Sequence, residues 1–242
     1  MSERASITLK IAGEPKRIEF DMPAGPVQPA ELLPVLRQFS NVMVEAAESR
    51  AARKGEVVSC TSGCGACCRQ LVPIREMEAR RLAAFVRALP EPRRSDIIKR
   101  FADAAARLAS SGLRGRLEGR AELDRGGRMA LKLDYFALGI ACPFLEAESC
   151  GIYEERPMIC REHLVTTPAA CCADPRAGGI RTLAITRADT AAAKLEARPD
   201  VPAWIPLIDL LAWVDAHPLD EAPREDPRDL LQRFVRDLVG GG

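Results

Sequence analysis

The sequence has almost no net charge. Its 35 basic residues are balanced by 34 acidic ones, which leaves a formal net charge of +1. That balance argues against a broad basic surface for nucleic acid. The most arginine-rich stretch, residues 114–128, is interleaved with acidic residues and is typical of a solvated mixed face. We therefore expect no nucleic-acid partner.

Signals for a membrane span or for export are also lacking. The longest apolar stretch, residues 203–214, contains Pro206 and Asp209 and falls short of the roughly 20 residues that a membrane span needs. The N-terminus lacks the apolar core of a secretory signal peptide. We therefore expect no membrane partner and a cytoplasmic location, where thiols are kept reduced.

Two further absences bear on catalysis. No glycine-rich phosphate loop follows a predicted strand, so a cosubstrate site is not indicated. Histidine occurs only as His163 and His217. His163 lies three residues after Cys160 and could be a ligand or an acid–base group, but a lone histidine in a loop is more often structural. The sequence therefore names no catalytic residue.

Hydrophobic periodicity predicts a mainly α-helical single domain. Alternating apolar residues at 7–11 and 18–22 predict an N-terminal β-hairpin around a turn at 12–15. Apolar residues at helical spacing predict five helices, within residues 32–46, 82–89, 97–108, 207–214 and 226–240. We divide the chain into a hairpin extension, residues 1–27, and a helical cysteine-cluster domain, residues 28–242.

What the sequence does have is clustered cysteine. Nine cysteines fall in two turn-rich regions, 60–68 and 142–172, which predicted helices separate. The odd count fits poorly with a fully paired disulfide framework. Three interpretations are open: metal ligands, a redox-active pair, or reduced cysteines packed in the core. A thioredoxin-like C-x-x-C would need a βαβ context, which is not predicted, and we favour metal ligands.

The first cysteine region reads CTSGCGACCR, from Cys60 to Arg69. Cys64 and Cys67 form a C-x-x-C pair, and the small residues between them allow both sulfurs to face one ion. Cys60 and Cys68 lie four residues on either side of Cys64, so on a helical turn all three would share a face. The adjacent Cys67 and Cys68 have Cα atoms about 3.8 Å apart, and such side chains usually diverge. Either one is a spectator or the site holds more than one metal atom.

The second region offers further ligands, at Cys142, Cys150 and Cys160. Cys142 precedes a proline, as cysteines beside iron–sulfur clusters often do. Four thiolates around a divalent ion leave a net charge of about minus two. Arginines close to cysteines in the sequence could offset that charge, at positions Arg69, Arg156 and Arg161.

Within residues 58–175 the sequence resembles the YkgJ-like cysteine-cluster family. The resemblance is carried by CTSGCGACCRQLVPI, with Glu76 and Glu78 beyond it, and by CPFLEAESCGIYEERPMICREHLVT. The family pattern is a C-x-x-C-x-x-C-C run followed by CPFL, C-x-I-Y and RP-x-x-C-R. This sequence departs from the pattern by placing three residues rather than two between Cys60 and Cys64.

The resemblance implies a domain that chelates zinc or iron, an iron–sulfur cluster being one form of such a centre. Carried over by position, it implies eight metal ligands: Cys60, Cys64, Cys67, Cys68, Cys142, Cys150, Cys160 and Cys172. Cys172 fits a late family cysteine better than Cys171 does. Some relatives are thought to be flagellin lysine N-methylases, so the alternative function is a metal-dependent enzyme that modifies a protein substrate.

The spacing of Cys60, Cys64 and Cys67 also matches radical SAM enzymes, in which three thiolates leave one iron of a four-iron cluster open. Those enzymes build the cluster on an α/β barrel, whereas the chain beyond Cys68 is predicted to be helical. We rank this interpretation lower. The prediction is thus a helical scaffold on which two cysteine-bearing loops converge on a metal centre, with a metal ion and a protein substrate or partner as its binding partners.

Overall fold

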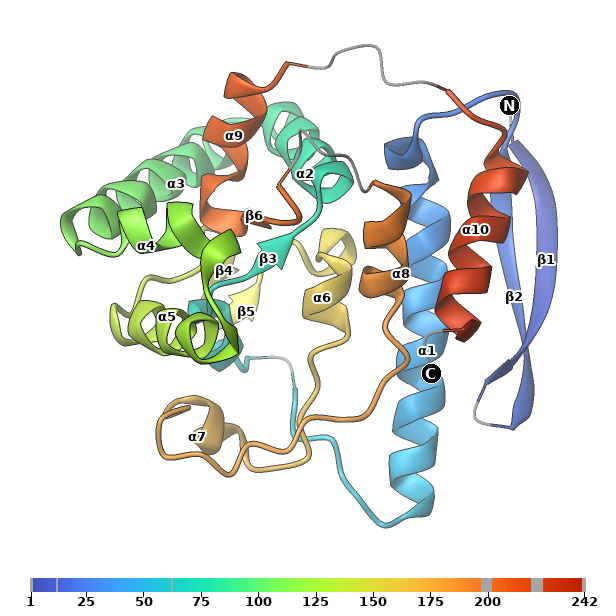
Figure 1. Cartoon of the computed structure of the whole chain (residues 1–242), viewed down its shortest axis with the longest axis horizontal. Helices are drawn as coiled ribbons and strands as arrows, with labels where there is room; N and C mark the ends of the chain where they lie inside the picture. Colours follow the sequence, from blue (N-terminus) through green and yellow to red (C-terminus); the bar gives the residue numbers. More distant parts are fainter. Residues whose placement is uncertain (1, 12, 62, 197–201, 219–223, 241–242) are drawn as a thin grey trace.

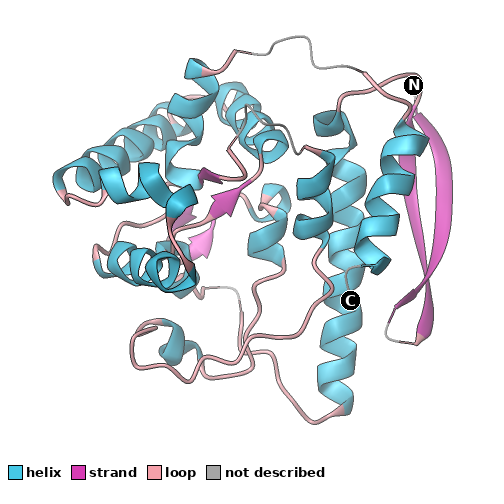
Figure 2. Ribbon diagram, viewed as in Figure 1, coloured by secondary structure: helices cyan, strands magenta, loops and turns pink. Residues whose placement is uncertain are grey.

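The structure is mainly α-helical, with a two-stranded hairpin along one side (Figures 1 and 2). The computed structural model describes residues 2–11, 13–61, 63–196, 202–218 and 224–240. The predicted fold class, a mainly α domain with an N-terminal hairpin, is confirmed. Within the described part of the chain, every helix is too short or too polar to cross a membrane.

The hairpin consists of β1 (Ser2–Ile11) and β2 (Glu14–Pro23), paired antiparallel. Residue 12, in the predicted turn, lies outside the described residues. The alternation places Ile18, Phe20 and Met22 on one buried face because successive side chains of a strand point to opposite sides. That face packs against helix α1, so the hairpin contributes to a shared core.

Helix α1 (Leu33–Arg53) is the longest element and follows a 3-10 turn, η1 (Pro29–Leu32). It packs against α8 (Ala188–Leu195), which in turn packs against α10 (Pro227–Gly240). Helix α10 begins as its sequence predicts. Pro227 occupies the first helical position, and the Asp226 carboxylate accepts a hydrogen bond of 2.8 Å from the Arg228 N–H.

A second core lies on the far side of the molecule, between α2 (Glu76–Ala88), α3 (Arg93–Ser110) and α9 (Leu210–Ala216), the last preceded by η5 (Leu207–Asp209). Helices α2 and α3 begin earlier than their apolar stripes indicated. The rings of Phe101 and Phe144 meet edge to face, with centroids 5.3 Å apart. Because Phe144 follows Cys142 closely, this contact ties the second cysteine region to the core.

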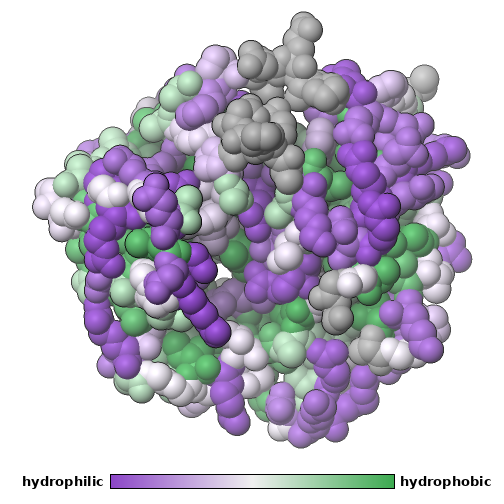
Figure 3. Space-filling view, viewed as in Figure 1, coloured by the Kyte–Doolittle hydropathy of each residue, from purple (hydrophilic) through white to green (hydrophobic). Residues whose placement is uncertain are grey.

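A third core contains elements that the periodicity did not predict, namely α4 (Arg114–Glu118), η3 (Gly119–Glu122) and α5 (Arg125–Ala137). The arginine-rich stretch folds into these elements and buries Leu117. Its charges pair locally, for example Arg116 with Asp134 at 2.7 Å. The face seen in Figure 3 is largely hydrophilic, with hydrophobic side chains in separate patches.

Short elements between these cores carry the cysteines or lie close to them in the chain. The elements are η2 (Ala66–Arg69), β3 (Pro73–Ile74) paired with β6 (Ile205–Pro206), β4 (Leu145–Glu146) paired with β5 (Ser149–Cys150), η4 (Tyr153–Glu155), α6 (Met158–Arg161) and α7 (Ala169–Cys172). Cys60 and Cys64 precede η2 and lie outside any helix. The expectation that they share a helical face with Cys68 is therefore wrong.

Replacement of Phe39 by alanine tests how the hairpin is held. Phe39 is fully buried on α1, and its ring contacts Phe20 of β2 and Phe234 of α10 at centroid distances of 5.7 and 5.4 Å. We expect Phe39→Ala to lower the free energy of unfolding by about 3–5 kcal/mol in urea denaturation, because it leaves a cavity. The exposed neighbour provides the control: Gln38→Ala should change it by about 0.5 kcal/mol or less. Equal losses for both variants would contradict this packing.

Candidate metal centre

Backbone hydrogen bonds hold the two cysteine regions against each other. The Cys142 N–H donates to the Cys68 carbonyl at 2.7 Å, and the Ser59 N–H donates to the Val165 carbonyl at 2.9 Å. The turn η2 also packs against α7, the helix of the last two cysteines. The two regions, distant in sequence, therefore meet in space, as the sequence analysis expected.

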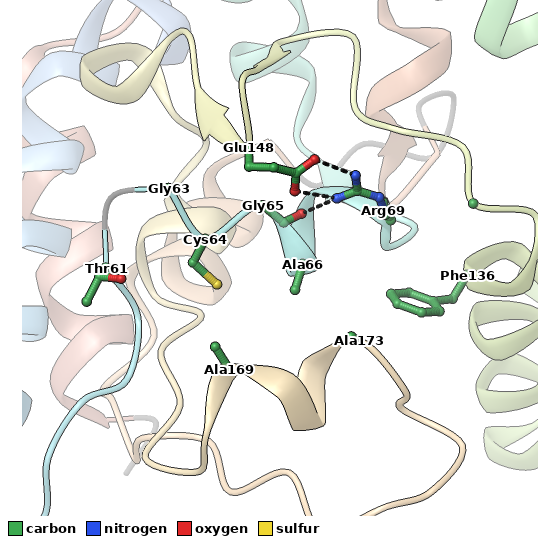
Figure 4. A pocket seen from close by; sticks show the side chains of 11 residues that line it. Thr61, Gly63, Cys64, Gly65, Ala66, Arg69, Phe136, Glu148, Ala169 and Ala173 are labelled. Atoms are coloured by element: carbon green, nitrogen blue, oxygen red, sulfur yellow. Dashed lines mark hydrogen bonds and ion pairs between the residues drawn. The ribbon is translucent and has the colours of Figure 1, made fainter.

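The turn between β4 and β5 lies over η2. Its residues Ala147 and Glu148 adopt left-handed backbone conformations, with φ of +46° and +58°. The Glu148 carboxylate accepts two hydrogen bonds from Arg69, at 3.0 and 2.6 Å (Figure 4). A Cβ at Gly65 would lie 2.5 Å from that carboxylate and 3.2 Å from the Glu148 Cα. The absence of a side chain at Gly65 thus allows the close approach of the turn.

Cys67 is the thiol that the others share. Its pKa is raised first by a hydrogen bond with the Cys68 thiol and then by burial. Burial also raises the pKa of five further thiols from both regions, and Cys67 adds to the rise for each: Cys60, Cys142, Cys150, Cys160 and Cys172. Such charge effects are strong only at short range. Together with the Cys142–Cys68 backbone hydrogen bond, these effects place Cys67 near cysteines of both regions.

The adjacent cysteines depart from the expected geometry. Cys67 and Cys68 lie together on the 3-10 turn η2, and their thiols are within hydrogen-bonding reach rather than divergent. Although Cys67 and Cys68 are neighbours in the chain, the Cys68 sulfur therefore lies close to the Cys67 sulfur.

Around Cys67 the remaining thiols form two groups. We define the outer group as Cys60, Cys64 and Cys172, because Cys64 raises the thiol pKa of both its companions after burial. We define the inner group as Cys142, Cys150 and Cys160. Burial is the main cause of the raised pKa in the inner group, and it takes the pKa of Cys142 to about 12. Both groups have Cys67 as a neighbour.

Arg156 is the cation that faces the thiols. Burial raises the pKa of Cys60 and Cys150, and the guanidinium of Arg156 acts against it by lowering both values. The guanidinium lies 3.8 Å from the centre of the Tyr153 ring. Its Nε is buried and has no hydrogen-bond partner among the described residues. Arg156 is therefore suited to offset negative charge on the sulfurs.

The other two arginines that the sequence pointed to have different partners. Arg69 is engaged by Glu148, as described above. Arg161 is buried and donates to the backbone carbonyls of residues 153, 154 and 156, and to Asn41 Oδ1 at 3.1 Å. Arg161 thus holds the loop that presents Arg156, and its charge also acts to lower the pKa of Cys150, which burial raises.

Glu78, which the sequence noted only as part of a motif, positions α6. Its side chain is buried, and its carboxylate accepts from the Met158 N–H at 2.7 Å and from the Arg75 N–H at 3.2 Å. Helix α6 carries Cys160, so Glu78 fixes the backbone next to that thiol. A carboxylate at the third residue of a helix gives no sequence signal for this role.

The residues fit a thiophilic metal in kind and in number. Burial strongly raises the pKa of the Cys142 and Cys160 thiols, yet both residues keep accessible surface. Residues that are deep and still accessible border a space instead of packing as core. Among the described residues, no three His, Cys, Asp or Glu side chains are already spaced to coordinate one ion. The thiols are gathered but have to move inward to bind a metal.

Residues 59–173 match the model of the CxxCxxCC family, described as "Putative zinc- or iron-chelating domain". This segment is similar to that family. The match includes both cysteine regions and all nine cysteines, and it confirms the cysteine-cluster resemblance. No curated protein and no solved structure matches the chain. The CxxCxxCC family assignment supports metal binding, with zinc or iron as the metal.

Two further candidates lie at the edge of the CxxCxxCC cluster. His163 has a pKa lowered by burial and then by Arg187, so its electrostatic neighbour is an arginine. Its Nε2 is buried without a hydrogen-bond partner among the described residues. Cys171 is adjacent to Cys172 and adds to the raised pKa of that thiol only after the effects of burial, Cys60, Cys64 and Cys67.

An open cleft of about 690 Å³ borders the outer group. Cys64 is the one cysteine, among the described residues, that lines it (Figure 4). Ala169 of α7 and Ala173, the residue that follows this helix, form one wall, and Phe136 of α5 stands at one end. The Arg69–Glu148 pair lies on the opposite side.

The acid sensitivity of Glu155 tests the anchoring of the second cysteine region. Arg81 donates to the Glu155 carboxylate at 2.8 and 3.2 Å, and Arg37 also pairs with it. The Arg81 hydrogen bond, assisted by Arg37, lowers the pKa of Glu155 from 4.5 to about 2. A lowered carboxyl pKa stabilises the fold above the unfolded pKa, and this stability is lost as the pH falls through the folded pKa.

We expect Glu155→Gln to lower the free energy of unfolding by about 1–3 kcal/mol at neutral pH. The difference from the wild type should shrink as the pH falls from about 4.5 to about 2. Urea denaturation across this range measures it. A difference that stays constant with pH would contradict the ion pair.

Proposed function

We propose that the protein binds zinc or iron through thiols from both cysteine regions, with Cys67 at the centre. The observation that carries this proposal is that a backbone hydrogen bond of 2.7 Å joins Cys142 to Cys68, next to Cys67, and so brings cysteines of both regions together. Core packing alone gives no reason for so many thiols to border an accessible space next to a buried guanidinium. Thiolates are the ligands that zinc and iron–sulfur centres prefer.

The number of thiols favours a centre with more than one metal atom. A single tetrahedral ion takes four ligands. The outer and inner groups each provide three thiols, and Cys67 could serve both. We therefore infer a polynuclear centre, either an iron–sulfur cluster or two ions that share Cys67. When bound, zinc would make the site structural, whereas an iron–sulfur cluster would add electron transfer.

The protein's own residues would perform three tasks in this function. The inner group, Cys67 and the outer group would hold the metal. Arg156 would offset the negative charge of the thiolates. Glu78, Glu155 and Arg161 would hold the backbone of the second region in place. Because ligand thiols bind as thiolates, metal binding would release their protons to solvent.

Cysteine substitutions test the ligand assignment. We expect Cys67→Ser and Cys160→Ser to lose most of the bound metal, to about a tenth of wild-type content or less, because each removes a thiolate from the shared centre. Metal content per chain, measured by mass spectrometry after anaerobic purification, gives the result. Cys171→Ser is the matched control and should keep its metal. Full metal content in Cys67→Ser would overturn the proposed arrangement, provided that its circular dichroism spectrum shows folded protein.

The metal stoichiometry tests the polynuclear centre. We expect more than one metal atom per chain in protein purified without oxygen. Iron with acid-labile sulfide and a visible absorption band near roughly 400 nm would identify an iron–sulfur cluster. A colourless protein with two zinc ions would identify a shared zinc site. One metal ion per chain without sulfide would contradict the polynuclear centre and leave a mononuclear one.

The alternative function, a metal-dependent enzyme resembling a flagellin lysine N-methylase, stays a prediction. Binding of S-adenosylmethionine by the metal-loaded protein, measured by calorimetry, would favour it over a binding domain.

A further inference from the structure

The cleft described above exposes one side of the thiol cluster. Cys64, which belongs to the outer group, lines the cleft, and its sulfur points toward α7 (Figure 4). Cys64 raises the thiol pKa of Cys60 and Cys172, after the larger effect of burial. Because Gly65 and Ala66, which precede Cys67 and Cys68, also line the cleft, Cys64 is open to solvent at the edge of the cysteine cluster.

The inner group, Cys142, Cys150 and Cys160, does not line the cleft, although all three residues keep accessible surface. Among the cysteines of the described residues, Cys64 is the one that an ion entering through the cleft would meet.

The walls of the cleft determine how far Cys64 is uncovered. At α7 the wall consists of Ala169 and of Ala173, which follows the helix, and both side chains end at Cβ (Figure 4). On the opposite side the Arg69–Glu148 pair fixes the β4–β5 turn, which approaches Gly65 closely. The larger Phe136 stands at one end. A bulky residue on the α7 wall would fill the space in front of the sulfur.

We propose that this cleft is the access route to the thiol cluster and that Cys64 is the thiol at which metal is received and released. The incoming group would be a metal ion, free or held by a small soft-donor ligand such as a low-molecular-mass thiol. The inference rests on the proposed metal-binding function for its role. The accessibility of Cys64 can be tested without any metal.

The first test uses metal-free, reduced protein and N-ethylmaleimide, with modified cysteines located by peptide mass spectrometry. We expect Cys64 to react about tenfold faster, or more, than Cys142 and Cys160, because thiol modification requires access. Ala169→Phe should slow the reaction of Cys64 by a similar factor. Ala170→Phe is the matched control, since Ala170 is exposed on the same helix and does not line the cleft. Equal slowing by both variants, or no slowing by either, would overturn the access route.

The second test follows zinc uptake and its removal by EDTA in stopped-flow experiments. Ala169→Phe should slow both processes about tenfold and leave the final metal content unchanged. A bulky side chain in the cleft would slow the passage of the ion without changing the metal ligands. Phe136→Ala, which widens the cleft, should speed both and remains informative if the α7 variant misfolds. Wild-type rates in both variants would overturn the inference. Failure of the wild type to bind metal would overturn the proposed function instead, and the maleimide test would still decide the access route.

Discussion

The hydrogen bond from the Cys142 N–H to the Cys68 carbonyl is the contact on which the site depends. It joins two segments that α2 to α5 separate in sequence, and it does so next to Cys67. Both partners are backbone groups, so the contact uses no thiol. The Arg69–Glu148 pair and the Glu78 carboxylate hold the same segments through charged side chains. The scaffold is thus assembled by groups other than sulfur, which leaves the thiols free to bind.

The electrostatics of the cluster follow from this assembly. Thiols that are buried side by side resist ionisation, because each new thiolate loses hydration and is repelled by its neighbours. The raised pKa values of Cys67, Cys142 and Cys160 express that resistance. Arg156 offsets only a part of it. A metal cation would provide the remaining positive charge at the point where the sulfurs converge. The cluster is therefore better suited to hold a cation than to hold ionised thiols alone.

The sequence predicted the parts of the fold whose apolar stripes are long. The hairpin and the helices around Phe39, Phe101 and Phe234 were recognised because bulky residues repeat at a regular spacing. Helix α8 was missed because its buried face is made of alanines, which mark a helical period only weakly. Helix α5 was missed because only Leu131 and Tyr135 are buried on it.

The candidate site was predictable in its residue types and not in its arrangement. Cysteine spacing identified the residues of interest, because thiols so close together in the sequence need a reason. Spacing did not show that Cys67 would be the shared neighbour or that Cys68 would turn toward it. Nor did it show what the absence of a side chain at position 65 allows. That is the close approach of Glu148, whose turn crosses η2 only in the folded chain.

The scaffold also bears on how tightly the site can bind. A small zinc domain that folds only around its ion loses part of the binding free energy to ordering its chain. Here three hydrophobic cores surround the cysteine segments, and Glu155 and Arg161 fix the backbone of the second region without any metal. Binding would therefore require mainly an inward movement of side chains. Since rigidly positioned ligands lower the cost of binding, the fold favours tight binding at the inner group. Exchange would then depend on the outer group, where Cys64 alone lines the cleft among the described cysteines.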